Sequence, residues 1–302
     1  MFEMMFENEQ GNKLTFGNGS DFTITEFSGL NPPKATINTN ESALVDGGTF
    51  NSSKVQMRSM NIAFAVERDA AKNRLEIYKV VQNKKPIKVF YKSEVLDIWI
   101  AGWVESTDFT YWATKNVCTV SILCPEPYFK SAQEIINVLS TVIPKFHFPF
   151  GSLTEEEIYQ IDEDQGTIEY HPEYGLIFGL VDAYTSIEVP NDGYIEAGLT
   201  FDFYCEQPVS NPRIIDYISK KWFKLNISML EGDHIIVTTG QGNKKAILKR
   251  NNVETNIFNL IDPGSTWLQL PPGGSLYVYE VGTGTPNDLR ITISHYDLYG
   301  GV

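Results

Sequence analysis

Short runs in which apolar and polar residues alternate recur along most of this chain, and they limit its fold more than any other feature. Alternation at period two is typical of a strand with one buried and one exposed face. Residues 55–66, VQMRSMNIAFAV, place four apolar side chains on one side: Met60, Ile62, Phe64 and Val66. Residues 117–124, VCTVSILC, alternate in the same way, so Cys118 and Cys124 share a face. Residues 86–91 and 95–104 predict two more strands, and we expect a bulge at Gly102.

One segment of the first half has helical spacing instead. In residues 69–82 the apolar set recurs every three or four positions: Ala71, Leu75, Tyr78 and Val81. Asp69 stands where a capping side chain belongs. We therefore expect one helix between the strands, with that apolar set facing the core.

Strand patterns return after about residue 176, roughly ten residues apart and separated by turn sequences such as EGD, GQGN, DPGS and PPGG. The expected strands are 186–189, 194–205, 213–217, 222–230, 233–239, 244–250, 256–261, 265–270, 275–281 and 288–296. This spacing is typical of a β-sandwich or jelly roll. The fold class is therefore mainly β.

The chain is expected to form two domains joined by an extension. Two prolines in CPEPYFK, residues 124–130, stop the strand ladder, and a short helix is expected at 131–140. We place the first domain at 1–133, a linker or acidic arm at 134–175, and the second domain at 176–302.

Charge separates the two halves and argues against nucleic-acid recognition. The net charge is −14. Residues 1–133 hold 14 Lys/Arg against 15 Asp/Glu, whereas residues 134–302 hold 10 against 23. A surface that binds phosphates needs a local excess of base, so we expect no sequence-specific nucleic-acid partner.

The sequence indicates a protein made and folded in a reducing cytosol. The start, MFEMMFENEQ, lacks the basic and apolar regions of a signal peptide. No run approaches the ~18 apolar residues of a membrane helix, so membrane insertion is not expected. The three cysteines, Cys118, Cys124 and Cys205, fit neither a metal site nor a disulfide framework and are read as buried free thiols.

Residues 155–173 contain eight Asp or Glu and no Lys or Arg. Such a run is typical of a solvated face or mobile arm, and a cation site or an acidic docking patch are the alternatives. The candidate docking residues for a partner are Glu155, Glu156, Glu157, Asp162, Glu163 and Asp164. A calcium loop at 162–173 fits poorly, because Thr167 stands where glycine is needed.

Residues that would indicate catalysis are missing from the sequence pattern. The four histidines, His147, His171, His234 and His295, lie far apart, and neither G-x-S-x-G nor H-E-x-x-H occurs. GQGNKK at 240–245 is read as a hairpin turn and not as a phosphate loop. We therefore assign no catalytic, cofactor-binding or metal residue and expect that the protein is not an enzyme.

Aromatic residues of the second domain leave one binding function open. Trp222 and Trp267 lie on expected sandwich strands and could stack on a sugar, although core packing explains them as well. Tyr277 and Tyr279 would share one strand face. A carbohydrate-binding module that recognises host cell-wall sugar is the alternative function.

The chain resembles the distal tail protein (Dit) family of siphophage tail components over nearly its whole length. The features that carry this resemblance in the first half are FNSSKVQMRSMNIAFAV at 50–66, the helix at 69–82, KPIKVFY at 85–91, WIAGWVES at 99–106 and VSILCPEPYFK at 120–130. In the second half they are residues 224–250, residues 265–281 and the closing Tyr-Gly-Gly-Val. Residues 140–185 fit least well.

The resemblance implies a split β-barrel with one helix, similar to tail-tube proteins, followed by a galectin-like β-sandwich. It implies that six copies form a ring around a channel. The ring would be a structural hub of the virion tail tip, assembled in the host cytoplasm and active in host adsorption. Its partners would be the tail tube protein, the tail-associated tip protein and a receptor-binding or baseplate protein.

Overall fold

A computed structural model describes residues 2–17, 19–41, 46–110, 116–139, 170–171, 175–176 and 186–302. The chain divides into two compact units. The first unit comprises Met1–Glu134, Asp192–Glu196 and Tyr296–Val302, and the second comprises Ile135–Asn191 and Ala197–His295. The structure differs from the expected division because two later segments, 192–196 and 296–302, return to the first unit.

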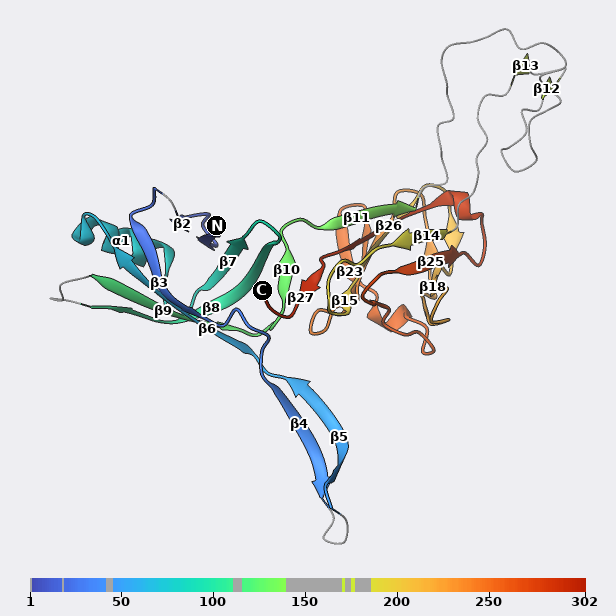
Figure 1. Cartoon of the computed structure of the whole chain (residues 1–302). Coiled ribbons are helices and arrows are strands. Elements are labelled where there is room, and N and C mark those ends of the chain that lie inside the picture. Colours follow the sequence, from blue (N-terminus) through green and yellow to red (C-terminus); the bar gives the residue numbers. More distant parts are fainter. Residues whose placement is uncertain are drawn as a thin grey trace, which may run out of the picture. The chain divides into compact units, whose positions relative to one another are not determined.

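The first unit is built on a nine-stranded antiparallel sheet (Figure 1). Seven strands follow one another in the order β2-β1-β7-β8-β9-β6-β3, and β10 joins β8 to the C-terminal β27. Their bounds are β1 Glu3–Asn8, β2 Lys13–Phe16, β3 Phe22–Ser28, β6 Arg58–Val66, β7 Pro86–Lys92, β8 Asp97–Phe109, β9 Val117–Cys124, β10 Phe129–Ser131 and β27 Leu298–Tyr299. The described residues form this sheet without a hydrogen-bonded pair between β2 and β3.

The alternation seen in the sequence decides which faces are buried. On β6 the predicted inward set is fully enclosed: Met60, Ile62 and Phe64 at 0% exposure and Val66 at 6%. On β9 both Cys118 and Cys124 are buried free thiols, as predicted, and Cys205 of the second unit is a third. Burial raises the pKa of Cys118 and of Cys124 to about 12.

The expected bulge at Gly102 is wrong. Gly102 pairs regularly with Ile87 on β7, and the register of β8 against β9 shifts between Val104 and Ser106 instead. Gly102 is needed for space. A Cβ there would lie 2.5 Å from Cγ2 of Ile122 and 2.8 Å from Sγ of Cys124. The glycine lets two strands and their core side chains approach closely.

The helix predicted at 69–82 is confirmed as α1, Ala70–Val80, but its buried face and its cap differ from the expectation. The buried residues are Asn73, Ile77 and Val80, whereas the predicted Leu75 is 65% exposed. Asn73 is held inside because its amide donates to the carbonyl oxygen of Arg68 at 2.7 Å.

At the N-terminal cap position of α1, Asp69 has a left-handed backbone (φ 40) and makes no capping hydrogen bond through its side chain. The cap that the sequence indicated is therefore not formed.

Arg58, at the start of β6, joins distant parts of the first unit although only 2% of it is exposed. Its guanidinium donates to the carbonyl oxygens of Pro127 (2.7 Å), Asn31 (2.8 Å), Gly300 (2.6 Å) and Gly29. The planar guanidinium fork can serve several acceptors at once. It therefore fixes the C-terminal segment against the chain that follows β3.

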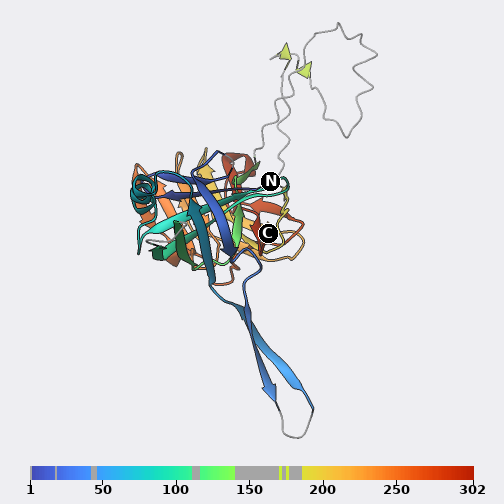
Figure 2. The same cartoon turned by 60° about the vertical axis from the view of Figure 1, so that its left-hand side comes forward.

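Between β3 and β6 the chain forms a separate antiparallel hairpin of β4 Ala35–Glu41 and β5 Gly48–Val55. Figure 1 and Figure 2 both show this hairpin standing away from the sheet of the first unit. Its residues are exposed throughout, apart from the half-buried Val55.

The second unit consists of a six-stranded sheet, β11-β26-β16-β21-β22-β23, and a four-stranded sheet, β14-β25-β18-β19. The ring of Phe201 on β16 packs against that of Tyr277 on β25, with centroids 6.2 Å apart, so the buried faces of the two sheets meet. The bounds are β11 Ile135–Leu139, β14 Ser186–Val189, β16 Thr200–Cys205, β18 Arg213–Asp216, β19 Trp222–Lys224, β21 His234–Thr238, β22 Lys245–Arg250, β23 Val253–Asn256, β25 Ser275–Glu280 and β26 Leu289–His295.

Short elements complete the second unit. They are the strand pairs β12 Tyr170–His171 with β13 Gly175–Leu176, β15 Ala197–Gly198 with β24 Gln269–Leu270, and β17 Val209–Ser210 with β20 Ser228–Met229, and the 3-10 helices η1 Phe258–Leu260 and η2 Pro286–Asp288. The turn predicted at 240–245 does connect the paired strands β21 and β22.

Three predictions in this unit are wrong. Of the strand expected at 265–270, only Gln269–Leu270 forms a strand. The helix expected at 131–140 is instead strand β11, because Ile135–Leu139 pairs with β26 more than 150 residues later in the chain. The strand expected at 256–261 is mostly η1, and the actual strand β23 lies just before it.

Two carboxylates stabilise loops of the second unit from inside. Asp216, 5% exposed, accepts hydrogen bonds from the hydroxyls of Ser219 and Ser275, both at 2.6 Å. Asp233, 1% exposed, forms a two-pronged ion pair with Arg250 at 2.8 and 2.6 Å. Burial by itself would raise the pKa of each carboxyl, but these hydrogen bonds outweigh it and the pKa of each is lowered.

Within the described residues, no helix has the length and apolar character that crossing a bilayer requires.

Candidate functional site

The first candidate surface is the pair of sheet edges in the first unit. In the described part of the chain, β2 pairs only with β1, and β3 pairs only with β6. An unpaired strand edge presents a row of N–H and C=O groups that can pair with another chain. Strand β3 also contains a register shift between Ile24 and Glu26, and such bulges are common where pairing is to be limited or redirected.

The second candidate is a polar face, which we define as the outward side chains of β3, β6 and β9. Its centre is a hydrogen bond of 2.6 Å from the hydroxyl of Ser121 to the amide oxygen of Asn61. Cross-strand pairing adds Ala63, Thr119 and Ser28 around it. The one basic residue on these three strands, Arg58, points into the core. This face therefore offers hydroxyls, the amide of Asn61 and the carboxylate of Glu26, but no cation, to a polyanion.

The third candidate is the hairpin of β4 and β5, which is amphipathic. Residues directly opposite each other share a face. The pairs Ile37–Ser53 and Thr39–Phe50 place Ile37 and Phe50 on one face. The other members of that face are Ala35, Thr39, Glu41, Ser53 and Val55. Ile37 is 64% exposed and Phe50 67%.

The other face of the hairpin is polar throughout. The amide of Asn38 donates to the hydroxyl of Ser52, and the amide of Gln56, just beyond β5, donates to that of Thr36, both at 2.9 Å. These contacts stabilise the polar face, whereas the apolar face has no comparable cover in the described chain. An apolar face that stays exposed indicates a surface that binds a partner.

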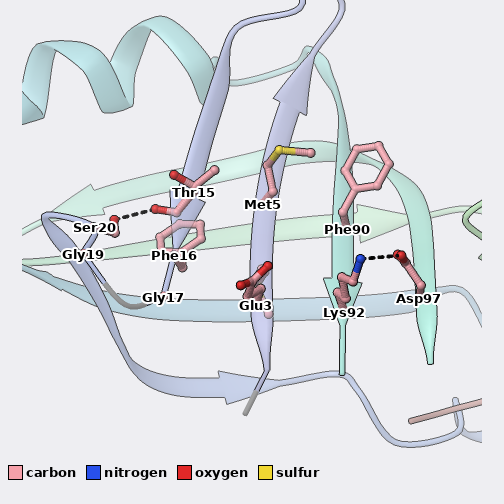
Figure 3. A pocket seen from close by; sticks show the side chains of 11 residues that line it. Glu3, Met5, Thr15, Phe16, Gly17, Gly19, Ser20, Phe90, Lys92 and Asp97 are labelled. Atoms are coloured by element: carbon pink, nitrogen blue, oxygen red, sulfur yellow. Dashed lines mark hydrogen bonds and ion pairs between the residues drawn. The ribbon is translucent and has the colours of Figure 1, made fainter. Parts of the chain in front are cut away.

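The fourth candidate is a groove of about 450 Å³ on the face of β2, β1 and β7 (Figure 3). Met5 pairs directly with Phe90 on one side and with Thr15 on the other, and these side chains make up the middle of the groove. We call it the Met5–Phe90 groove. Its ends hold Glu3 and an ion pair of 3.3 Å between Lys92 and Asp97, and Gly17, Gly19 and Ser20 close one side.

The sugar-stacking residues suggested by the sequence lie on the second unit, and each carries a cation over its ring. The guanidinium of Arg213 lies 5.8 Å from the ring of Trp222, and Nζ of Lys244 lies 5.4 Å from that of Trp267. Tyr277 and Tyr279 are buried, at 0% and 1% exposure, and cannot contact a sugar. Sugar binding by the two tryptophans stays a prediction, with part of each ring already in contact with a neighbour.

The acidic docking residues and the poor calcium loop, residues 155–173, fall outside the described residues except for Tyr170 and His171. Among the described residues, no three His, Cys, Asp or Glu side chains gather in a way that could hold a metal ion. His234 lies 3.4 Å from Asp202 on the neighbouring strand, and His295 is buried at 2% exposure on β26. The structure therefore does not unite His234 and His295 in one site, and His147 lies outside the described residues.

Sequence reasoning missed the hairpin and the groove. The hairpin could have been predicted, because the segments ATINTNE and GTFNSSKV are rich in Thr, Asn and Ser and flank a short connection. The groove carried none, since it forms only when residues 5, 15 and 90 are brought side by side by the order of the strands.

Comparison with solved structures finds the same fold in proteins of phage tails. The sequence matches no family model and no curated protein. The structure is similar to that of Dit (gp 19.1) of phage SPP1, described as a paradigm of the hub adsorption apparatus in phages that infect Gram-positive hosts. The two are 14% identical, with a TM-score of 0.63 over 99% of each chain.

The baseplate of phage P2 in its activated conformation, solved with Ca and with Sr, contains a chain that is also similar. The identity is 11% and the TM-score 0.50, over 97% of this chain and 98% of that one. The chain thus has the Dit fold along its whole length, and the resemblance seen in the sequence is confirmed at the level of the fold.

Proposed function

We propose that this protein is a structural hub of a phage tail tip. Six copies form a ring that joins the tail tube protein to the tail-associated tip protein and anchors receptor-binding or baseplate proteins for host adsorption. The ring is assembled in the host cytoplasm and functions at the tip of the virion tail. Its role is to hold other proteins in place and not to catalyse a reaction.

The observation that carries this proposal is the extent of the fold match. Dit of SPP1 covers 99% of this chain and is itself covered to 99%, so the match extends over both units of this chain. A shared fold does not by itself transfer a function, so the surfaces must also suit the role.

The surfaces of the first unit support a ring. The open edges of β2 and β3 lie at the two ends of one sheet and are different surfaces. When one such surface binds the other on the next identical copy, the copies form a ring if the rotation from copy to copy returns to the first. The polar face around Asn61 and Ser121 suits the wall of a channel for DNA, because it holds no cation that would bind phosphates. We assign this face to the lumen and the open edges to contacts between subunits.

Native mass spectrometry and cryo-electron microscopy of the purified protein test the ring directly. A mass of six copies and a central channel are expected. A strict monomer that also fails to assemble with its tube and tip proteins would contradict the proposal.

The lumen assignment has its own test. The double variant Asn61→Lys/Ser121→Lys should keep the ring but retain double-stranded DNA in low salt, whereas the unmodified ring should not. A control, Glu254→Lys, adds positive charge on the exposed strand β23 of the second unit and should retain little. Equal retention by both variants would refute the assignment.

The acidic run gives a proposal for the periphery. Deleting residues 152–172 should leave the ring intact but weaken attachment of a peripheral protein, because a charged arm can order against a basic partner. Ring mass and co-purification of the peripheral protein are the two measurements. Loss of the ring itself would show that this segment is structural.

A further inference from the structure

The connection between β18 and β19 presents two large apolar side chains to solvent. Tyr217 is 55% exposed and Ile218 is 68% exposed. The ammonium group of Lys220 lies over the ring of Tyr217, 3.6 Å from its centroid. Apolar side chains that are exposed side by side commonly mark a surface that binds a partner. We call residues 216–221 the β18–β19 tip.

The tip is held in one conformation although its apolar residues are exposed. The buried carboxylate of Asp216 accepts hydrogen bonds from the backbone N–H groups of Ile218 (3.0 Å) and Ser219 (3.2 Å). The hydroxyls of Ser219 and of Ser275, on the neighbouring strand β25, donate to the same carboxylate at 2.6 Å each. A surface that is already ordered loses less conformational entropy when it binds.

The apolar surface continues from the tip onto the outward face of the four-stranded sheet. Ile215 on β18 lies directly opposite Val278 on β25 and Trp222 on β19. Leu276 shares this face, and its carbonyl oxygen accepts a hydrogen bond from the backbone N–H of Tyr217 at 2.8 Å. The four side chains on the sheet are half-buried. The tip is therefore the exposed end of a longer apolar strip.

The same hairpin is a basic island in the acidic half of the chain. Residues 213–224 hold four of the ten Lys or Arg of residues 134–302 and a single carboxylate, that of Asp216, which is buried. The two lysines of the tip, Lys220 and Lys221, form no ion pair with a carboxylate of the described residues. Their charges are therefore available to an acidic partner.

We propose that the β18–β19 tip is a docking site for an acidic segment of a partner protein that also carries large apolar side chains. The two lysines pair with carboxylates of the partner, and Tyr217 and Ile218 cover its apolar side chains. This inference rests on the proposed hub role, because a hub has to hold other proteins. It assigns one such contact to a surface of the second unit.

The apolar part of the surface favours a protein over other anionic ligands. A polyanion without apolar groups, such as heparin, would pair with the lysines and leave Tyr217 and Ile218 exposed. An anionic lipid surface would contact the tip alone and not the strip that runs from Leu276 to Trp222. Protein interfaces combine an aromatic and aliphatic centre with a charged rim, which is the composition found here.

Fluorescence anisotropy with labelled polymers tests the docking site on the full-length protein. A random copolymer of glutamate and tyrosine should bind, because it offers carboxylates and aromatic rings together. Polyglutamate offers carboxylates alone and should bind more weakly by about fivefold or more. Stronger binding of heparin, or of vesicles that contain phosphatidylglycerol, than of the copolymer would overturn the inference.

Variants of the tip locate the binding. Ile218→Ser and Lys220→Glu/Lys221→Glu should each weaken binding of the copolymer by about fivefold or more. The matched control, Lys244→Glu/Lys245→Glu, makes the same change of charge at an exposed turn of the same unit and should leave the affinity within about twofold. An equal loss in the control would show that only net charge matters, and the docking site would be refuted.

Native mass spectrometry of the same variants separates this inference from the ring. Variants that keep the ring but lose the copolymer support the docking site. A ring whose binding of the copolymer is the same in every variant overturns the docking site alone, whereas a monomer that binds the copolymer through the tip overturns the ring alone. Binding that occurs only after deletion of residues 152–172 would assign the tip to the acidic run of this chain and overturn the assignment to a partner.

Discussion

Replacing Arg58 by Met should be among the most damaging single changes in the first unit. The substitution keeps an unbranched side chain but removes every donor of the guanidinium. Four carbonyl oxygens then lose their charged hydrogen-bond donor together: those of Gly29, Asn31, Pro127 and Gly300. The ring of Phe129, whose centroid lies 4.4 Å from the guanidinium carbon, also loses its contact with the cation.

The magnitude follows from the burial of these groups. A buried polar group left without a partner costs about 1–3 kcal/mol, and Arg58→Met leaves four carbonyl oxygens without their donor. Since some carbonyls will regain water, we expect a loss of about 3–5 kcal/mol, a large part of a total stability of about 5–15 kcal/mol. Arg58→Lys keeps the charge but not the planar fork and should lose about 1–3 kcal/mol.

Urea unfolding followed by circular dichroism measures this loss, and hydrogen exchange locates it. Exchange should rise first in residues 298–302 and around Gly29, because Arg58 holds these segments together. Arg68→Met, at an exposed position, is the matched control and should change stability by less than about 0.5 kcal/mol. An Arg58→Met protein whose unfolding free energy and exchange equal those of the control would refute the reasoning.

Three further predictions concern the core and the titratable groups. Gly102→Ala should cost about 1–3 kcal/mol in urea unfolding, because its Cβ has no room beside β9; an unchanged midpoint would show that the sheet relaxes freely. The pKa values of Asp216 and Asp233 are lowered in the folded protein, so the unfolded chain binds protons first as the pH falls. The stabilisation that these two carboxylates give is therefore complete above about pH 4 and is lost as the pH falls through their pKa values in the folded protein. Calorimetry should measure the fall in melting temperature of each protein between about pH 6 and about pH 3. This fall should be smaller for Asp216→Asn than for the unmodified protein, because the variant has lost one of the two carboxylates. Cys118 and Cys124, whose pKa burial raises to about 12, should react with a thiol reagent only after unfolding, and rapid reaction in the native protein would contradict their enclosure.

The sequence predicted much of the strand content, because the alternation that indicates a strand lies within a few consecutive residues. Each strand of the first unit that the sequence indicated relies on alternation within a few residues, as in Met60, Ile62 and Phe64. The helix at 70–80 was predictable in place but not in orientation. Its inward residue Asn73 is polar, and its burial depends on acceptors that only the folded chain supplies.

The failures occurred where a distant partner outweighs local preference. Residues 135–139 have acceptable helical character, yet they pair with β26 because an open strand was available there. Tertiary pairing regularly overrides propensities that amount to less than about 1 kcal/mol per residue.

What the sequence by itself determined is a mainly β, acidic, two-part chain with buried thiols and a resemblance to distal tail proteins. The tertiary structure alone decided which distant residues come together in a surface or in the core. The Met5–Phe90 groove joins residues 85 positions apart, and Arg58 joins positions separated by up to 242 residues. Such contacts depend on the order of strands in a sheet, and period-two alternation fixes which face of a strand is buried but not which strand becomes its neighbour.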